Sequence, residues 1–501
     1  MHVLQVISWV VCVVLTILLL WVGVGVFLSD PYFQWTTVRS PFQTTVNDDG
    51  SIELLESNES DRPIFTLNPL AQLSAFARAG ARIVIYRYLP ERSLGTTTAE
   101  VIQNIHNLRF DPAKPYVITG AHYSDLYVRN LGVFFNELTN DRLENTASTS
   151  SPLAKDLQNR QRIALQTLAL DLAFLESTHR LVTTIVPLGG NTFTGINIYE
   201  EPSDSLHAVL FTLQKLDQST ATHQAAVQLK AKHRTALEHE VVRYLSSVMD
   251  PTTFTVKKTI RLSSARDGVK REAAFYDTVI AWKTVQLATK QDLMDAKQLP
   301  TELAELNRPQ LWKQRIIEQY WRSDHGFFAN DLSDQGNVFS GDSLIAFSTG
   351  LLDAKNAEDL KKMERIAQYI HDHQADQPFP LQYSATNSQN QLQPAVKLFA
   401  PGYMGEGIWS HWGIEYLKLL LALGDSALPD HCQYLSRAQA GLQTYSDNIA
   451  RFGGYPELYG SDGKPFETAA VRAVMHTGWV VNYEAAQTEL VRHLRTTSCQ
   501  F

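Results

Sequence analysis

The chain has 501 residues, of which 44% are hydrophobic, 19% charged and 10% aromatic, a composition typical of a globular rather than a disordered protein. This length suits one large domain or two to three ordinary ones. The formal net charge is -8 at pH 7, and Lys and Arg form no cluster. Binding a phosphate backbone requires concentrated positive charge, so nucleic acid is not expected as a partner.

The first 29 residues are strongly apolar. Residues 3–28, VLQVISWVVCVVLTILLLWVGVGVFL, contain no charged side chain. Such a run is long enough to span a bilayer as a helix. It is also too long for a cleavable signal peptide and lacks a small-residue cleavage site. We therefore expect a transmembrane signal anchor at residues 1–29, in a single-pass membrane protein with its large domain outside the cytoplasm.

Beyond the anchor, residues 30–66 are polar and turn-rich, as in a stalk or linker, and residues 67–501 form the main domain. There, apolar residues recur at the three- and four-residue spacing of amphipathic helices. Only a few short segments have the residue pattern of strands. The clearest helical patterns are at 153–177, 224–249, 272–290, 357–373 and 406–424, and the strand-like segments are 82–89, 182–188 and 253–262.

About a dozen helices in one long domain form either a solenoid or a closed ring. No self-similarity at a fixed period is present, which argues against a repeat array. The sequence therefore predicts an all-α fold, an (α/α)6 toroid of six helical hairpins, in which the loops at one end build a pocket.

Two segments near the middle of the domain bring acidic and basic residues together. In GAHYSDLYVRNLGVFF, residues 120–135, Asp125 and Arg129 stand four apart. They form either an ordinary ion pair on one helix face or a clamp for sugar hydroxyls through charge-assisted hydrogen bonds. In residues 261–282, Asp267 lies in an Arg-Asp-Gly turn, and Asp277 follows on the next helix.

Two later segments place carboxylates among glycines and aromatic rings. In residues 402–424, Glu406 precedes Trp409 and Trp412 at a helix start. Glu406 is either a charge that the helix dipole stabilises or a catalytic carboxylate. RFGGYPELYGSDGKPF, residues 451–466, holds Glu457 in a run of Gly, Pro and Tyr that predicts a loop.

Four of these segments, in order, resemble motifs of the six-hairpin (α/α)6 glycoside hydrolases, the group of processing α-glucosidase, mannosylglycerate hydrolase and glycogen-debranching enzymes. They are SARDGVKR (264–271), WRSDHGFFANDLSDQGNVFSGDSLIAF (321–347), YMGEGIWSHWGIEYLKLL (403–420) and GGYPELYGSDGKPF (453–466). The resemblance implies hydrolysis of an α-linked glucoside or mannoside with inversion, without metal or other cofactor. The family's Ser-Gly-x-Asp reads Ser-Ala-Arg-Asp here.

The resemblance also implies roles for individual residues. Inversion requires two carboxyl groups about 6.5–9.5 Å apart, on opposite sides of the scissile bond. Asp267, or Asp277 in its place, is then the general acid and Glu457 the general base. The residues implied to hold the sugar of a glycoside or oligosaccharide substrate are Tyr123, Asp125, Arg129, Glu406, Trp409, Trp412 and Tyr455.

Two other classes of function remain open at this stage. A polysaccharide lyase or sugar epimerase with the same toroid would depend on His122, Tyr123 and Arg129 instead of the carboxylates. A membrane-anchored glycan-binding protein would keep the aromatic residues and need none of the catalytic ones. The sequence also leaves open whether Cys432 and Cys499 pair or stay free, and it does not predict the oligomeric state.

Overall fold

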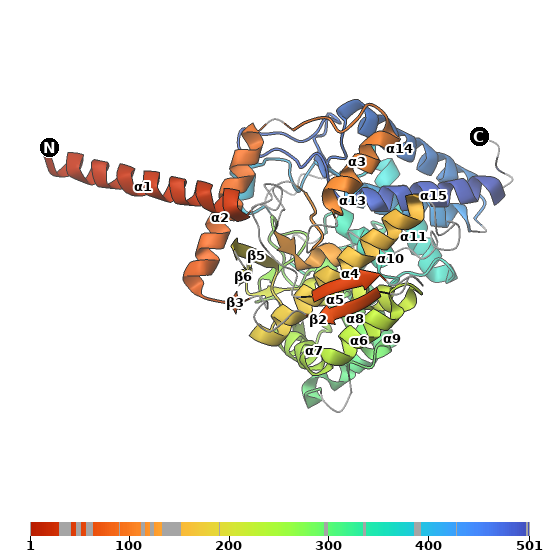
Figure 1. The fold of residues 1–501 in the computed structure, drawn as a ribbon. Coiled ribbons are helices and arrows are strands. Elements are labelled where there is room, and N and C mark those ends of the chain that lie inside the picture. The colour runs from red at the N-terminus through yellow and green to blue at the C-terminus, as the bar shows by residue number, and fades with distance from the viewer. Residues whose placement is uncertain are drawn as a thin grey trace.

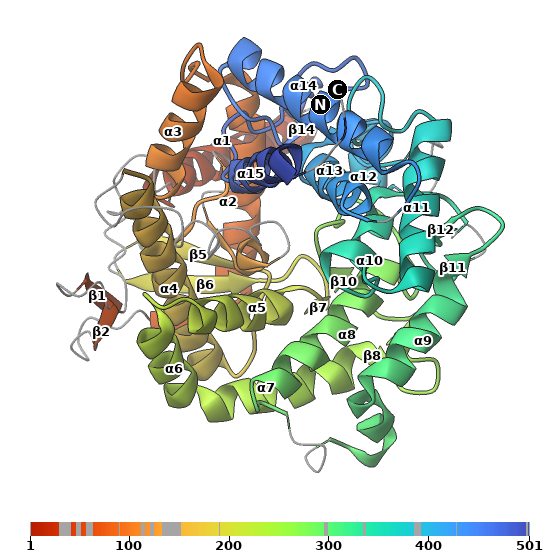
Figure 2. The ribbon, with the colours of Figure 1, turned by 90° about the vertical axis from the view of Figure 1, so that its right-hand side faces the viewer.

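A computed structural model describes most of the chain. The residues described are 2–29, 42–46, 52–56, 64–89, 91–111, 116–120, 125–132, 152–189, 191–294, 299–333, 337–384, 392–426, 428–496 and 499. Figure 2 shows their helices arranged around a ring. Helix α5 (Ser205–Gln218) lies inside α6 (His223–Lys232), α8 (Phe275–Lys290) inside α9 (Pro309–Tyr320), and α13 (Ser410–Gly424) inside α14 (His431–Phe452).

The burial of each helix follows from its sequence. In α13, SHWGIEYLKLLLALG, only Lys418 and Ala422 are partly exposed. A helix that is apolar nearly all round belongs in the interior. The outer helix α11 (Ala357–Asp372) instead has one buried stripe that includes Met363, Ile366 and Ile370, with charged residues on its other faces.

The ring is closed by elements from opposite ends of the domain. Helix α3 (Thr98–Arg109) packs against α14, and Thr98 Oγ1 donates a hydrogen bond to the Ser446 carbonyl at 2.8 Å. The last helix, α15 (Val480–Thr496), packs against both α13 and α14. The expected helical toroid-like arrangement is therefore found.

A four-stranded sheet lies at one side of the ring, in the order β3-β6-β5-β4. It consists of β3 (Ile64–Thr66), β4 (Leu126–Tyr127), β5 (Thr184–Gly189) and β6 (Thr192–Ile196). Strand β4 leads directly into the 3-10 helix η3 (Val128–Leu131), so the sheet fixes the position of Arg129.

The remaining elements connect these parts. The helices are α2 (Pro69–Tyr88), α4 (Pro152–Thr178), α7 (Arg234–Val248), α10 (Ile345–Ser348), α12 (Pro394–Phe399), η5 (Thr301–Asn307) and η6 (Gly341–Leu344). The strands are β1 (Phe42–Val46), β2 (Ile52–Glu56), β7 (Glu201–Pro202), β8 (Met249–Asp250), β9 (Thr255–Val256), β10 (Leu262–Ser263), β11 (Trp321–Arg322), β12 (Phe327–Phe328), β13 (Ile408–Trp409) and β14 (Leu458–Tyr459).

The predicted transmembrane helix is not supported, and this part of the fold prediction is wrong. Helix α1 (His2–Ser29) projects away from the ring (Figure 1). Crossing a bilayer requires about 20 consecutive apolar residues. Among the described residues no helix has both the length and the apolar character that a span needs, which also overturns the single-pass localisation and the membrane as a partner.

Cys432 and Cys499 form a disulfide with their Cα atoms 5.6 Å apart, so of the two states left open by the sequence the paired one is found. The bond ties α14 to the end of the chain. These two cysteines and His431 also make up a group with the spacing of metal ligands among the described residues. Because both thiols belong to the disulfide, neither offers a thiolate to a metal.

Candidate active site

Asp267 lies in the loop between β10 and α8, and three residues hold it in place. Its Oδ1 accepts a hydrogen bond from the Ser264 backbone N–H at 2.8 Å, and its Oδ2 accepts one from Arg129 Nη2 at 2.8 Å. Tyr199 donates its hydroxyl to the Asp267 carbonyl at 2.7 Å. The side chain is still 21% exposed. Asp267 is therefore a fixed carboxylate that remains accessible to a ligand.

Asp277, the other candidate for the acid, has a different environment in the first turn of α8. Its Oδ1 accepts a hydrogen bond from Ser203 Oγ at 2.7 Å, and its Oδ2 is paired with Arg266. The side chain is only 3% exposed. Both oxygens of Asp277 are thus occupied by groups of the protein, as in an internal ion pair.

The structure adds a third carboxylate, Asp204, which the sequence analysis missed. Its Oδ2 accepts a hydrogen bond from the Ala265 backbone N–H at 3.0 Å and lies 3.5 Å from the Tyr276 hydroxyl. Its Oδ1 is buried and has no hydrogen-bond partner among the described residues. In the sequence, an Asp immediately before a helix looks like an ordinary N-cap. However, its side chain makes no capping hydrogen bond to α5.

Burial raises the pKa of Asp204 to about 7. Arg129 opposes this shift, while the negative charges of Asp267 and Asp277 add to it. A carboxyl group in such surroundings keeps its proton near neutral pH, because ionisation would place a further negative charge in a site with little solvent.

Arg129 interacts with two of these carboxylates, Asp267 and Asp204. Burial lowers the pKa of its guanidinium, but Asp267 and Asp204 outweigh that effect and raise it above the usual value. Arg129 therefore stays charged and holds Asp267 and Asp204 in one cluster. The sequence pointed to Arg129, although with a different partner.

The sequence suggested Asp125 as the partner of Arg129, but Asp125 pairs with another residue. It accepts two hydrogen bonds from Arg82 of α2, at 3.1 and 3.2 Å, with both side chains almost fully buried. Asp125 precedes β4 and Arg129 lies in η3, so the two do not share an α-helical face. The i,i+4 ion pair between them is therefore not found. The contacts of Asp125 are those of a scaffold, and its sugar-binding role stays a prediction.

Glu457 is positioned by the turn after α14 and by the β13–β14 pair. Gly453 ends α14 in a left-handed conformation with φ of 61°, which glycine adopts without steric cost. The Glu457 carbonyl then accepts hydrogen bonds from the backbone N–H and the hydroxyl of Ser410, at 3.0 and 2.9 Å. Its side chain is buried, and Oε1 accepts one from the Val474 N–H at 3.3 Å. The expected loop is found, with Glu457 inside the molecule.

Three of the aromatic residues predicted to bind sugar, Trp409, Trp412 and Tyr455, are buried. The Trp412 ring stands edge-on to Tyr276, with centroids 6.3 Å apart. This contact joins α13, which begins beside Glu457, to α8, which follows the Asp267 loop. Trp409 Nε1 donates to the Tyr403 carbonyl at 2.7 Å. Tyr455 is fully buried, which raises its pKa.

One predicted residue, Glu406, lies apart from this region. Glu406 is exposed and lines a separate cavity of about 490 Å³ together with Asp462 and Lys464. Tyr123, with His122, lies outside the described residues. The structure thus brings together Asp267, Asp277 and Arg129 with the unpredicted Asp204, and places Glu457 beside the start of α13. The role of each residue in catalysis or binding stays a prediction.

No protein-family model matches the chain, and no curated protein matches it either. Solved structures do match. A rhamnosidase from Klebsiella oxytoca with rhamnose bound is 13% identical, with a TM-score of 0.48, 79% of this chain covered and 65% of that one. This chain therefore spans about two thirds of the length of that rhamnosidase.

Two further matches cover more of the partner protein. A mannosylglycerate hydrolase from Thermus thermophilus is 13% identical, with a TM-score of 0.46, 79% of this chain covered and 100% of that one. The neutral trehalase of Saccharomyces cerevisiae is 12% identical, with a TM-score of 0.47 and 91% of each chain covered. The matched proteins are named as a rhamnosidase, a mannosylglycerate hydrolase and a trehalase. At such identities and TM-scores they carry no argument about the reaction, which has to come from this chain's own residues.

Proposed function

We propose that the protein is a glycoside hydrolase that cleaves an α-linked glucoside or mannoside with inversion of configuration. The observation that carries the proposal is the cluster in which Arg129 holds the accessible carboxylate of Asp267 beside the buried, proton-holding Asp204. Glu457 lies against Ser410 at the start of α13, the helix whose Trp412 contacts Tyr276 of α8. Two acidic groups of different environment, one on each side of a site, are what hydrolysis with inversion requires.

In this proposal Asp267 is the general acid and Asp277 is not. Asp277 is enclosed by Arg266 and Ser203, so it has no free oxygen to offer a leaving group. Asp267 and Asp204 both interact with Arg129, and Asp204 is the member whose pKa burial raises to about 7. The proton delivered to the glycosidic oxygen belongs to that pair, and Asp267 is the accessible member that transfers it. Glu457 activates the attacking water.

The test uses the full chain with a panel of α-glucosides and α-mannosides. We expect release of sugar by the wild type and loss of release in Asp267→Asn and Glu457→Gln. Proton NMR of the first product formed would show the β-anomer, as inversion requires. Hydrolysis that persists in both variants would remove these residues from the mechanism.

Other outcomes would replace the proposal itself. An α-anomer as the first product would exclude inversion. An unsaturated product absorbing in the ultraviolet would indicate a lyase. Binding of glycans without release of sugar from any substrate would indicate a glycan-binding protein.

A further inference from the structure

Residues 467–477 form a strap that is bound to the end of α2. The Tyr88 hydroxyl donates to the Ala469 carbonyl at 2.9 Å, and Arg472 Nη2 of the strap donates to the Tyr86 carbonyl at 2.8 Å. The paired residues are 381 and 386 positions apart, so these contacts exist only in the folded domain. The motifs assign no role to the strap, and the proposed mechanism makes no use of it.

The strap is also bound to Glu91, which lies just after α2. The Met475 N–H donates a hydrogen bond to Glu91 Oε2 at 3.2 Å. The carbonyl of the same peptide group, that of Val474, accepts the Glu457 N–H at 2.9 Å. A peptide group is planar and rigid, so holding its N–H also fixes the direction of its carbonyl. Glu91 therefore orients the peptide group to which the backbone of Glu457 is bound.

Val474 also contacts the carboxylate of Glu457. Its N–H donates to Glu457 Oε1 at 3.3 Å. The Val474 side chain is fully buried and packs on Gly120, where an added Cβ would lie 2.5 Å from Val474 Cγ1. In a close-packed interior such a side chain has little room to shift. Val474 thus fixes both the backbone and the carboxylate of Glu457, while Glu91 and Gly120 fix Val474.

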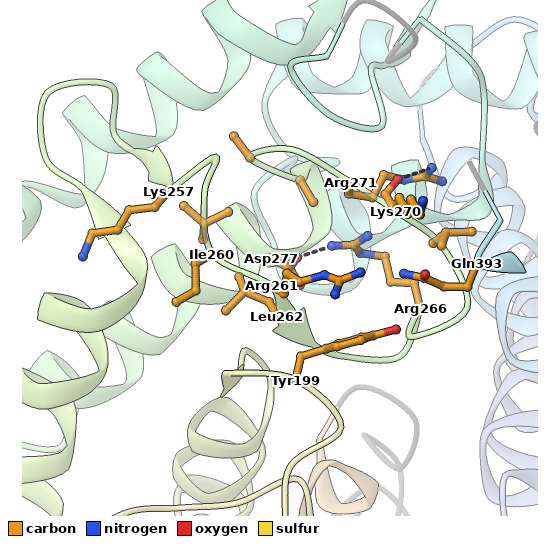
Figure 3. Close-up of a pocket in the computed structure, with 14 residues that line it drawn as sticks. Tyr199, Lys257, Ile260, Arg261, Leu262, Arg266, Lys270, Arg271, Asp277 and Gln393 are labelled. Carbon is orange, nitrogen blue, oxygen red and sulfur yellow. Dashed lines mark hydrogen bonds and ion pairs between the residues drawn. The ribbon is translucent and has the colours of Figure 1, made fainter. Parts of the chain in front are cut away.

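The proposed acid is held in a different way. Arg266, the residue before Asp267, is paired with Asp277 of α8 (Figure 3), which anchors the loop of the acid directly to a helix. The base instead depends on a peptide group that another residue, Glu91, holds in place. A change at Glu91 should therefore reach Glu457 and leave Asp267 unaffected.

We propose that Glu91 is a positioning residue for Glu457, acting through the Val474–Met475 peptide group of the strap. This inference rests on the proposed hydrolase function, in which Glu457 is the general base. Without the Glu91 carboxylate, the Met475 N–H loses its acceptor and the peptide group rotates, which moves the Glu457 carboxylate away from the attacking water. A catalytic group displaced by about 1 Å loses about a hundredfold in rate.

The test compares four forms of the full chain on an α-glycoside that the wild type hydrolyses. Glu91→Ala removes the acceptor of the Met475 N–H, whereas Glu91→Gln keeps an amide oxygen that accepts it. The matched control is Glu100→Ala. Glu100 also accepts a backbone N–H, that of Thr96 at 3.0 Å, but at an exposed site in the first turn of α3.

We expect Glu91→Ala to lower kcat by about 10- to 100-fold and to change KM less than about twofold, because Glu457 acts on the water and not on the bound sugar. Glu91→Gln should stay within about threefold of the wild type, since it retains the hydrogen bond. Glu100→Ala should match the wild type within about twofold. Wild-type kcat in Glu91→Ala, or an equal loss in Glu91→Gln, would overturn the proposal.

A second experiment separates positioning of the base from support of the fold. In Glu457→Ala, azide replaces water as the nucleophile: its nitrogen bonds to the anomeric carbon, the bond to the glycosidic oxygen breaks, and that oxygen takes the proton of Asp267. Azide is already an anion, so the product, a β-glycosyl azide, forms without a base. Adding Glu91→Ala to this variant should change the rate less than about twofold, because no carboxylate remains to be positioned. A loss as large as that in the wild-type background would show that Glu91 only supports the fold, and would overturn the proposal.

Hydrogen–deuterium exchange of the strap does not depend on activity. We expect peptides from residues 467–477 to exchange about tenfold faster in Glu91→Ala than in the wild type or Glu100→Ala, because a hydrogen bond that holds the strap is lost. If the wild type hydrolyses no glycoside but this pattern holds, the hydrolase proposal fails and the link between Glu91 and the strap stands. If the wild type hydrolyses glycosides and the strap exchanges equally in all forms, this inference alone is wrong.

Discussion

Two carboxylate–arginine pairs of the same chemistry lie at different depths in this molecule. Asp125 and Arg82 are joined by two hydrogen bonds, with side-chain exposures of 1% and 0%. Asp267 and Arg129 are joined by one, with exposures of 21% and 11%. In a fully enclosed pair neither charge can reach water. Removing either partner therefore leaves the other charge buried without compensation and destabilises the fold. A pair at a partly open surface is able to exchange its partner for a ligand.

The partners of the two pairs strengthen this contrast. Arg82 lies beside Arg78, so Asp125 is the counter-charge for two buried arginines, and its charge raises the pKa of Arg78 against the effect of burial. Arg129 instead serves two carboxylates, Asp267 and Asp204. The first site has surplus positive charge around one carboxylate, and the second has surplus negative charge around one arginine. The second site also contains Asp204, whose pKa burial raises to about 7.

The largest effect expected is on catalysis at the open pair. Asp267→Asn should lower kcat/KM for α-glycosides by about 10²–10⁴-fold, the usual contribution of a general acid or base. Its free energy of unfolding should change by less than about 1 kcal/mol, because a partly exposed ion pair contributes little. Initial-rate kinetics and denaturant unfolding of the same preparation check both values. A loss of stability of the size expected at Asp125 would contradict the distinction between the two pairs.

The enclosed pair should show the opposite behaviour. Asp125→Asn leaves Arg82 buried without its counter-charge and should lower the free energy of unfolding by about 3–5 kcal/mol. The control is Asp324→Asn, at a side chain that is 73% exposed, where we expect a change within about 0.5 kcal/mol. Urea unfolding followed by circular dichroism measures both. If Asp125→Asn unfolds like the control but loses activity, Asp125 is a substrate ligand and the scaffold interpretation is wrong.

Asp204, beside the open pair, should make the stability of the protein depend on pH. Its carboxyl group has a pKa of about 7 in the folded protein, whereas an Asp in an unfolded chain has one near 3.9. The folded state therefore holds a proton that unfolding releases, and the stability it contributes, complete below about pH 4, is lost as pH rises from about 4 to 7. Asp204→Asn has no such proton to release.

The Asp204→Asn variant should therefore gain stability relative to the wild type as the pH is raised. The gain between pH 4.5 and 8 should be a few kcal/mol at most, since each pK unit corresponds to about 1.4 kcal/mol. Urea unfolding at intervals across this range measures the difference. Parallel curves for variant and wild type would show that Asp204 ionises normally and has no proton to share with Asp267.

Sequence patterns predicted the helices better than the pairings. The helix at 272–290 and the loop around Glu457 were identified because apolar spacing and a Gly-Gly-Tyr-Pro run act locally. Residues 82–89 were predicted to be a strand from their Ile, Val and Tyr content, yet 82–88 lie in α2 and Leu89 caps its end. That helix is started by Pro69 and by the Asn68 side chain, which caps the Leu70 N–H at 2.9 Å. A cap at the start of the helix outweighed the β propensity of its final turns.

The partners of the charged side chains were not predictable in the same way. Arg82 and Asp125 are separated by 43 positions, and Arg129 and Asp267 by 138. Only the folded ring brings each pair together, so the spacing of Asp125 and Arg129 was misleading. Asp204 could not be identified from the sequence either, because its sequence context is that of any helix N-cap. Its neighbours come from the loop after β10, from α8 and from η3.

Substitution of Glu406 is expected to have the smallest effect on activity and stability. It is best measured beside substitution of the buried Glu457. Glu406 is an exposed carboxylate, and within the described residues no arginine pairs with it. Glu406→Gln should change the free energy of unfolding by no more than about 0.5 kcal/mol, and kcat/KM by less than about twofold. Glu457→Gln, measured beside it, should abolish hydrolysis, because the buried carboxylate is the proposed base. If Glu406→Gln instead lost hydrolysis while Glu457→Gln kept it, the base would be the exposed carboxylate Glu406 and the assignment of Glu457 would be wrong.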